Sequence, residues 1–370
     1  MQRIKELDGV RGIAIFLVLL WHYIFCQVGS TILESNIGFL FKYLSLTWSG
    51  VDLFFVLSGF LIVGILLDAR GAKTYFLTFY IRRALRILPL YYVMFFLLFL
   101  LPKYISNDWL FSRNISLWNY LTFTQNFYMI KEGFGANWMG ITWSLAVEEQ
   151  FYIILPLMVW ALPRKKLTYV FLGLICLAPI FRLVLSDFGG YVLPFARADS
   201  ILMGGILAII YRTPRIKDEL VENYPYLFFI FIIFLIGAIV LTLYLPAIGN
   251  AFVHLWLAVF YSLFLVICTL RPGKVTDLLI SNRFFVWLGL RSYGIYLFHQ
   301  PVSSLLHQYL NGNVIPRFSD IREFYVTVFA LVITFILAEV SFRFFESVFL
   351  SWGRQFRYEA QTDTGSLRIL

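Results

Sequence analysis

The chain has 370 residues, of which 60% are hydrophobic, 19% are aromatic and only 14% are charged, and its mean hydropathy is +0.79. Ordinary globular chains are about half apolar and about a quarter charged, so a soluble protein of this length could not bury so much apolar surface. The composition excludes soluble, disordered and coiled-coil classes and indicates a polytopic membrane protein. The three cysteines are widely spaced and form no CxxC pair, so we expect neither a disulfide framework nor a metal or redox motif.

The net charge of +9 would suggest a nucleic-acid partner in a soluble protein. In a membrane protein, basic residues first report topology, because they accumulate on the cytoplasmic side. With the N-terminus placed in the cytoplasm, the expected cytoplasmic segments carry 20 Lys and Arg residues and the expected outer segments carry 6. This bias predicts that both termini are cytoplasmic, and it makes a nucleic-acid partner unnecessary.

Apolar runs near the length of a membrane helix, about 20 residues, predict an all-α bundle of about ten transmembrane helices. The connecting segments are too short for a soluble domain, so we expect one transmembrane domain over residues 1–350 and a cytoplasmic tail over residues 351–370. Residues 103–139 are expected outside, with a surface-lying or re-entrant helix at 118–129. The expected spans are residues 10–28, 48–68, 87–102, 140–161, 168–186, 193–211, 225–245, 249–270, 285–308 and 324–350.

Ionisable side chains inside these spans are the main functional signal, because each costs about 2.5–3.5 kcal/mol to insert at mid-membrane. Arg11 and His22 are eleven residues apart, close to three helical turns, which places both on one helix face about 16 Å apart along the axis. An elongated anionic ligand could then rest its charged end on Arg11 and its reactive end at His22. The alternative is a topological Arg and a His that is bonded to a neighbouring helix.

A second basic pattern precedes the expected third span. Arg83 and Arg86 are three residues apart and therefore share a helix face. Paired guanidinium groups hold phosphates through bidentate hydrogen bonds. Ordinary topological charge is the simpler interpretation of this pair taken alone.

Two adjacent carboxylates, Glu148 and Glu149, lie inside the expected fourth span. Only one of them can comfortably face a given pocket, and we expect this to be Glu148; the alternative is a structural pair that binds backbone or arginine groups. In the ninth span, His299 is expected at about the depth of His22. It could line the same cavity, and a structural hydrogen bond is at least as well supported.

Arg197 and Asp199 lie together near the outer end of the expected sixth span, where we expect a local ion pair. Asp52 lies near a span end, where snorkelling or capping would explain it. His254 belongs to no recognisable constellation, so a core or interface role is expected for it.

Taken in order, these stretches resemble the acyltransferase 3 family of bacterial multi-spanning membrane acyltransferases. The resemblance extends from residue 7 to about residue 350. Some relatives carry a soluble esterase-like domain at the C-terminus, and we expect it to be absent because only residues 351–370 follow the last span. The matching residues are Arg11 and His22; residues 50–60, GVDLFFVLSGF; residues 82–89, RRALRILP; residues 143–152, WSLAVEEQFY; Arg197 with Asp199; and Ser292 to His299.

The resemblance implies transfer of an acyl group, commonly acetyl, from acyl-CoA to a sugar hydroxyl of lipopolysaccharide, exopolysaccharide or peptidoglycan at the bacterial inner (cytoplasmic) membrane. It implies functional roles for Arg11, His22, Arg83 and Arg86. We expect the three arginines to hold the phosphates of acyl-CoA and His22 to act as general base or to take the acyl group itself. Glu148 would orient or charge-balance an imidazole, as carboxylates do in catalytic triads. Acyl-CoA is expected as a substrate, with no permanently bound cofactor or metal.

A transporter or flippase for a glycolipid is the alternative from another class. The buried His, Glu and Arg residues would then relay protons or substrate. No evident inverted repeat supports such a transporter. In either case, we expect membrane lipid and a glycan or glycolipid as partners.

Overall fold

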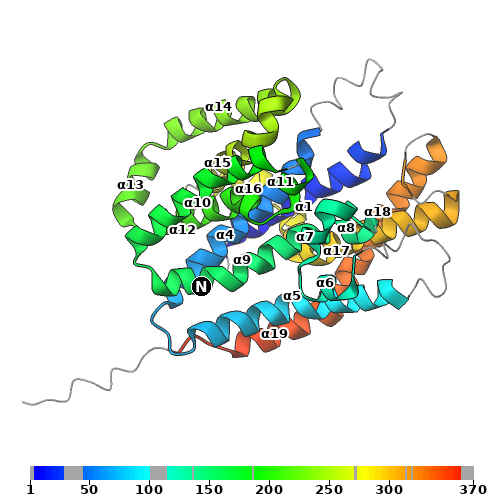
Figure 1. The fold of residues 1–370 in the computed structure, drawn as a ribbon, viewed down its shortest axis with the longest axis horizontal. Helices are drawn as coiled ribbons and strands as arrows, with labels where there is room; N and C mark the ends of the chain where they lie inside the picture. Colours follow the sequence, from blue (N-terminus) through cyan, green and yellow to red (C-terminus); the bar gives the residue numbers. More distant parts are fainter. Residues whose placement is uncertain are drawn as a thin grey trace, which may run out of the picture.

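The described residues of the computed structural model are almost entirely helical and contain no β-strand (Figure 1). The structure describes residues 4–28, 45–100, 115–135, 137–185, 187–270, 273–312, 315–317 and 320–359. The longer helices are α1 (Lys5–Tyr23), α4 (Gly50–Ala69), α5 (Tyr75–Leu100), α9 (Thr142–Ala161), α10 (Arg164–Val184), α12 (Ala198–Tyr211), α14 (Tyr224–Leu243), α15 (Pro246–Leu270), α17 (Arg283–Asn311) and α18 (Ile321–Ser341).

Shorter helical segments connect or extend these helices. They are η1 (Phe25–Gln27), η2 (Ser45–Ser49), α6 (Leu117–Leu121), α7 (Gln125–Glu132), α8 (Asn137–Gly140), α11 (Asp187–Val192), η4 (Phe195–Arg197), α13 (Pro214–Glu222), α16 (Lys274–Leu279), η5 (Phe342–Glu346) and α19 (Ser347–Gln355).

Seven helical stretches within the described ranges are long and apolar enough to cross a membrane. This confirms an all-α architecture with several apolar spans. The helices at the expected third, sixth and ninth spans are not among the seven. α12 has only 14 residues, α5 carries three arginines near its middle, and α17, with 29 residues, is interrupted by ionisable side chains such as Arg291 and His299. The number of ten spans stays a prediction.

The structure moves two of the expected boundaries. α5 begins at Tyr75, so Arg83 and Arg86 lie within this helix instead of preceding it. At the other end of the chain, α18 continues through the π-helical turn η5 into α19, which ends at Gln355. Helical structure therefore extends beyond residue 350, where we expected the tail to begin.

The aromatic stretch 118–129 does not form one helix. A turn at Phe123, whose φ is 54°, separates α6 from α7. Phe123 is buried, its ring stacks on Tyr91 of α5 at 4.5 Å, and its carbonyl accepts a hydrogen bond of 2.7 Å from Gln150 Nε2 of α9. This stretch is therefore packed against the bundle. Residues 103–114 of the expected outer segment lie outside the described residues.

Glycines allow two helix pairs to approach until their backbones touch. A Cβ atom on Gly12 of α1 would lie 1.9 Å from the Phe285 carbonyl oxygen of α17. A Cβ atom on Gly59 of α4 would lie 1.8 Å from the Ile201 carbonyl oxygen of α12. Small residues permit such contacts between membrane helices. The first contact places the side chains of α1 directly beside those of α17.

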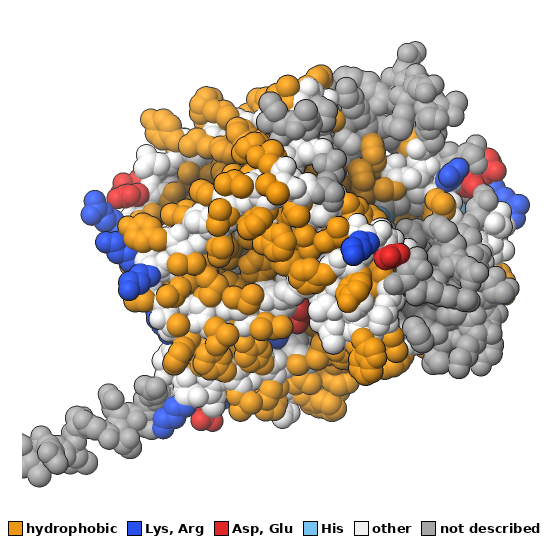
Figure 2. Space-filling model, in the orientation of Figure 1, with side chains coloured by type: hydrophobic (Ala, Val, Ile, Leu, Met, Phe, Trp, Pro, Cys, Tyr) orange, Lys and Arg blue, Asp and Glu red, His pale blue; other side chains and the backbone are white. Residues whose placement is uncertain are grey.

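Hydrophobic side chains cover most of the face shown in Figure 2, and charged side chains lie mainly toward its margins. Large apolar side chains such as Ile153, Leu183, Phe229 and Phe329 are exposed on the outside of the bundle. A soluble monomer rarely exposes a continuous apolar surface of this kind. The surface is that of a protein whose outer helices face lipid.

Candidate active site

A cavity of about 110 Å³ lies between α1, α4, α5, α9 and α17. Its charged lining consists of Arg11, Arg83, Arg86 and Glu148. We call it the arginine cavity. The structure thus brings together three arginines that sequence reasoning selected independently, from positions 11 and 83–86.

The arginines of this cavity carry more positive charge than their surroundings neutralise. Arg11 forms an ion pair of 3.0 Å with Asp8, one turn earlier on α1. The guanidinium carbon of Arg83 lies 4.9 Å from the ring centroid of Tyr152. Neither Arg83 nor Arg86 forms an ion pair with any carboxylate in the described ranges. Such a cavity favours an anionic ligand.

Glu148 lines the arginine cavity, close to Arg83 and to the hydroxyl groups of Ser58 and Tyr152, which are hydrogen-bonded to each other at 2.7 Å. This agrees with its expected inward orientation. Within the described residues it forms no hydrogen bond with the His22 imidazole, which lines a different cavity and has other partners, and its expected role toward an imidazole stays a prediction. Glu148 instead lies where it offsets part of the arginine charge.

The second cavity, of about 720 Å³, holds both candidate histidines. We call it the histidine cavity. Aromatic side chains make up much of its wall, and His22 of α1 and His299 of α17 lie on it together. The aromatic lining residues include Trp21, Trp48, Phe134, Trp143, Phe188, Tyr191 and Tyr296.

Hydrogen bonds assign the hydrogen positions of the two histidines. His299 Nδ1 lies 2.6 Å from the Tyr296 carbonyl oxygen, which can only accept, so this nitrogen carries the hydrogen and Nε2 of the neutral ring is an acceptor. His22 Nδ1 lies 3.3 Å from His299 Nε2 and 3.0 Å from the Val18 carbonyl oxygen. It therefore donates to both.

His22 Nε2 then keeps its lone pair. In the described part of the chain it has no hydrogen-bond partner. A positioned imidazole nitrogen with a lone pair beside a cavity can take a proton or an acyl group.

The two cavities share part of their walls. Val51 and Tyr296 line both of them. The Tyr296 hydroxyl group donates to the Ile141 carbonyl oxygen at 2.9 Å and is 2.6 Å from Ser144 Oγ, which fixes the ring at this position. Arg11 and His22, about three turns apart on α1, thus lie on adjoining cavities.

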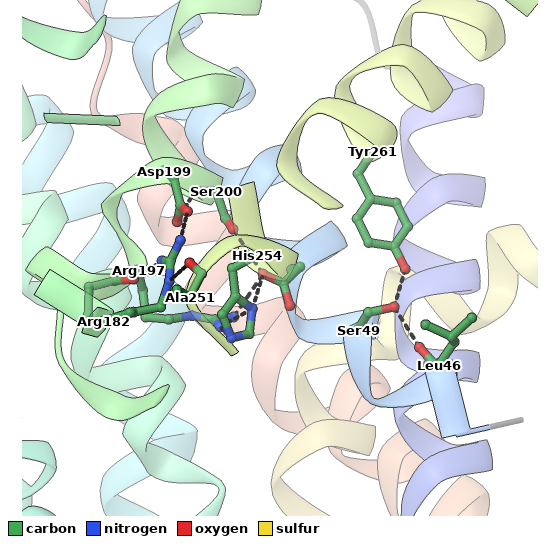
Figure 3. A network of polar contacts seen from close by, with 11 residues as sticks. Leu46, Ser49, Arg182, Arg197, Asp199, Ser200, Ala251, His254 and Tyr261 are labelled. Carbon is green, nitrogen blue, oxygen red and sulfur yellow. Dashed lines mark hydrogen bonds and ion pairs between the residues drawn. The ribbon is translucent and has the colours of Figure 1, made fainter. Parts of the chain in front are cut away.

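A separate group of charged side chains forms the polar network shown in Figure 3. Arg197 Nη2 pairs with Asp52 Oδ1 at 2.8 Å, and Arg182 Nη2 pairs with Asp199 Oδ2 at 2.6 Å. We call these four residues, with His254 beside Asp52 and Arg197, the buried ion cluster. Their side chains are at most 7% exposed.

The buried ion cluster corrects three expectations. Arg197 and Asp199 do not pair locally, because each bonds a residue of a different helix. Asp52 does not snorkel, since its carboxylate is enclosed and also accepts a 2.9 Å hydrogen bond from Ser200 Oγ. His254 does belong to a constellation. Sequence spacing could not reveal it, because its members come from η4 and from helices α4, α10, α12 and α15.

The buried ion cluster supports the aromatic wall of the histidine cavity. The guanidinium carbon of Arg197 lies 5.6 Å from the Trp143 ring and 5.5 Å from the Tyr191 ring. The His254 ring meets the Trp48 ring edge-on at 5.2 Å. The buried ion cluster thus sets the position of three rings that line the histidine cavity. The residues of the cluster do not line that cavity.

The family model described as an acyltransferase domain, Acyl_transf_3, matches residues 4–341. The chain belongs to the acyltransferase 3 family. The match includes both cavities and the buried ion cluster, and it confirms the resemblance seen in the sequence. No solved structure matches the chain.

Curated relatives of this acyltransferase carry acetyltransferase names. A Bacillus subtilis protein named "Putative peptidoglycan O-acetyltransferase YrhL" is 30% identical over 95% of this chain and 55% of its own length. The Staphylococcus aureus proteins "Putative O-acetyltransferase SACOL0978" and "O-acetyltransferase OatA" are 28% and 26% identical, over 95% and 92% of this chain and 58% and 56% of their own lengths. The chain spans a little over half the length of these relatives.

Proposed function

We propose that this acyltransferase moves an acetyl group from acetyl-CoA to a hydroxyl group of a cell-surface glycan. The proposal is supported mainly by the two adjoining cavities, of which one is lined by three arginines and the other by His22 and His299. Val51 and Tyr296 line both of them. An elongated donor with an anionic end and a reactive end matches this arrangement. The acyl-CoA thioester is such a molecule.

The chemistry assigned to His22 is general-base catalysis. His22 Nε2 takes the proton of the acceptor hydroxyl while the hydroxyl oxygen attacks the thioester carbonyl carbon. A carbon–oxygen bond forms, the carbon–sulfur bond breaks, and the coenzyme A thiolate leaves and takes up a proton. His299 holds the His22 ring in the tautomer that leaves Nε2 unprotonated. An acyl-histidine formed first on the same nitrogen would give the same products.

The acceptor binds, in this proposal, in the histidine cavity. Aromatic side chains with hydrogen-bonding groups among them offer flat surfaces for the apolar faces of sugar rings. The name of the Bacillus subtilis relative contains peptidoglycan. It favours a peptidoglycan sugar over the lipopolysaccharide and exopolysaccharide acceptors that the resemblance also implies.

Transfer in a reconstituted membrane tests the function. Proteoliposomes with the full chain receive acetyl-CoA labelled in the acetyl group, and peptidoglycan fragments serve as acceptor. We expect labelled ester to form with the native protein and not with His22→Gln, since glutamine can still hydrogen-bond but cannot accept the proton. A glycolipid transporter or flippase, the alternative class, would instead move glycolipid across the bilayer without consuming the thioester. That result would contradict the proposal.

The proposal includes a cytoplasmic donor side with both termini there. Lys131 precedes the apolar span Trp138–Ala161, and Lys165 follows it. We expect cysteines placed at these two positions to react with impermeant maleimide from opposite sides of the membrane, with Lys165 inside. Labelling of both from one side would exclude this orientation.

A further inference from the structure

A third cavity, of about 170 Å³, lies between the C-terminal helix and α5. Arg82, Arg83, Arg86 and Arg354 line it together with Tyr358. We call it the C-terminal cavity. It shares Arg83 and Arg86 with the arginine cavity, so the two adjoin across these side chains. Figure 1 shows α19 lying along α5, which brings Arg354 to this position.

A hydrogen-bonded strap formed by residues 356–359, which follow α19, lies against α5 and the residues just before it. Arg82 Nε donates to the Phe356 carbonyl oxygen at 2.7 Å. The hydroxyl groups of Thr74 and Thr78 donate to the Arg357 carbonyl oxygen at 2.9 and 3.1 Å. The strap also sets Tyr358 beneath the Arg82 guanidinium, whose carbon lies 5.4 Å from the ring centroid. The wall of the C-terminal cavity is therefore built by specific contacts.

The chain offsets only part of the charge of the C-terminal cavity, through Glu148 near Arg83 and Arg86 and Glu346 near Arg86. None of Arg82, Arg83, Arg86 and Arg354 forms an ion pair with a carboxylate in the part of the chain that the structure describes. Arginines placed this close together repel one another, and a multiply charged anion removes that repulsion while it accepts their hydrogen bonds. Four arginines on the wall of one cavity thus indicate a ligand with more than one phosphate.

We propose that the C-terminal cavity binds the nucleotide end of the acyl-CoA donor, its 3′-phosphorylated adenosine diphosphate. Arg354 and Arg82 bind phosphate there, and Arg83 and Arg86, which line both cavities, bind phosphate where the donor passes from the C-terminal cavity to the arginine cavity. This inference rests on the proposed function, because it takes acyl-CoA as the donor.

An anionic lipid headgroup is the other source of phosphate for this arginine cluster. The nucleotide is favoured because the C-terminal cavity adjoins the arginine cavity at Arg83 and Arg86 and presents the aromatic ring of Tyr358, a surface on which a purine can stack. A headgroup such as that of phosphatidylglycerol has no base and one phosphate. The experiment below separates the two.

Binding measurements on the full chain in nanodiscs of phosphatidylcholine test the site. The probes are coenzyme A and acetyl-pantetheine, which lacks the nucleotide. We expect Arg354→Ala to weaken coenzyme A binding roughly 10- to 100-fold, the effect of removing a charge-assisted hydrogen bond, and to leave acetyl-pantetheine binding unchanged. Arg354→Lys should restore part of the affinity. Arg357→Ala is the matched control, since this exposed neighbour does not line the cavity, and it should bind coenzyme A normally.

Unchanged coenzyme A affinity in Arg354→Ala and in Arg82→Ala would overturn the site. An equal loss for acetyl-pantetheine would do so as well, because the effect would then be global. Nanodiscs that also contain phosphatidylglycerol test whether the cavity binds a lipid headgroup instead. If Arg354→Ala changes only the retention of phosphatidylglycerol, the cavity is a lipid site and the inference is wrong.

The same measurements separate this inference from the proposed function, because they require no acceptor and no transfer. Arg354-dependent coenzyme A binding without any acetyl transfer would refute the function and leave the site standing. Acetyl transfer that proceeds with equal donor affinity in the native protein and in Arg354→Ala would refute the site alone.

Discussion

The buried ion cluster and the histidine pair are both polar groups inside an apolar bundle, yet they are built in opposite ways. In the cluster, each arginine meets a carboxylate, at 2.8 Å for Arg197 and at 2.6 Å for Arg182, and the groups are enclosed on all sides. In the pair, both ring nitrogens of His299 and Nδ1 of His22 form hydrogen bonds, and His22 Nε2 is left beside a cavity of about 720 Å³. A polar residue in a membrane span therefore indicates reactivity only when an atom stays unpaired next to open space.

The difference also separates two energetic roles. Charges taken out of water are tolerated when they are paired, but the pair itself adds little to stability, while removal of one partner is strongly destabilising. The cost of placing a neutral imidazole at the wall of a cavity is smaller, so His22 can be replaced without collapse of the fold. The buried ion cluster should thus report on folding and the histidine pair on turnover, and the following variants test that division.

The largest effect is expected for His22→Ala. Loss of the general base should lower acetyl transfer by about 100- to 10,000-fold, and more if the nitrogen carries the acyl group. The protein should stay in the membrane in normal amount, as measured by quantitative immunoblotting of the membrane fraction, with transfer normalised to that amount.

His307 offers the control for this variant. It lies on α17, bonds Thr327 at 2.8 Å and lines neither the arginine cavity nor the histidine cavity. His307→Gln should leave transfer within a few-fold of native. Near-normal turnover in His22→Ala would show that the base was assigned to the wrong residue.

The next largest effect is on stability. Arg197→Ala leaves Asp52 buried without its counter-ion, which should cost about 3–5 kcal/mol of unfolding free energy. We expect a lower thermal unfolding temperature in detergent and reduced amounts in the membrane. Replacement of both partners, as in Arg197→Met with Asp52→Leu, should recover much of the stability. If Arg197→Ala unfolds at a native-like temperature but loses transfer, the buried ion cluster acts in turnover, as the histidine pair does, and the proposed division of roles is wrong.

A smaller effect is expected for the arginine cavity. Arg83→Ala or Arg86→Ala removes a charge-assisted hydrogen bond worth about 1.5–3 kcal/mol, and should weaken donor binding roughly 10- to 100-fold while folding stays intact. Equilibrium binding of acetyl-CoA measures it, with unfolding temperature as the second readout. Unchanged donor affinity in both variants would reassign the two arginines to membrane topology.

Much of the architecture could be predicted from hydrophobic runs, because each apolar helix must span or line the bundle. The start of α5 at Tyr75 could not, since its arginines interrupt the apolar run while the helix continues through them. In α17, ionisable residues such as Arg291 and His299 likewise interrupt the apolar run and lower its hydropathy. A composition-based boundary marks where a segment becomes apolar, and a helix can begin well before that point.

The candidate site could be predicted in part for a similar reason. Arg11 and His22 lie on one helix, so their spacing in the sequence and the geometry of an α-helix predict their relative positions directly. The pairing of Asp52 with Arg197 joins residues 145 positions apart, and no local pattern encodes it. His299 is an intermediate case. Its expected depth in the membrane, similar to that of His22, indicated that the two residues could share a cavity. It could not show that their rings share a hydrogen bond.

The smallest effect is expected for His299→Ala, and it tests the role of the hydrogen bond between the two histidines. His299→Ala removes the acceptor for His22 Nδ1–H, although the Val18 carbonyl oxygen remains as a partner, so only one neutral hydrogen bond of about 0.5–1.5 kcal/mol is lost. Transfer should fall roughly 2- to 12-fold. His299→Gln should recover most of it, because the glutamine amide oxygen can reach the position of Nε2 and accept the same hydrogen.

Assays of His22→Ala and His299→Ala side by side, at equal protein amounts, decide between the two rings. If His299→Ala abolishes transfer and His22→Ala does not, the base lies on α17. If neither substitution matters, acyl transfer does not proceed through this histidine pair. A fall in His299→Ala that glutamine does not rescue would mean that His299 takes part in proton transfer itself, because a positioning role requires only the acceptor.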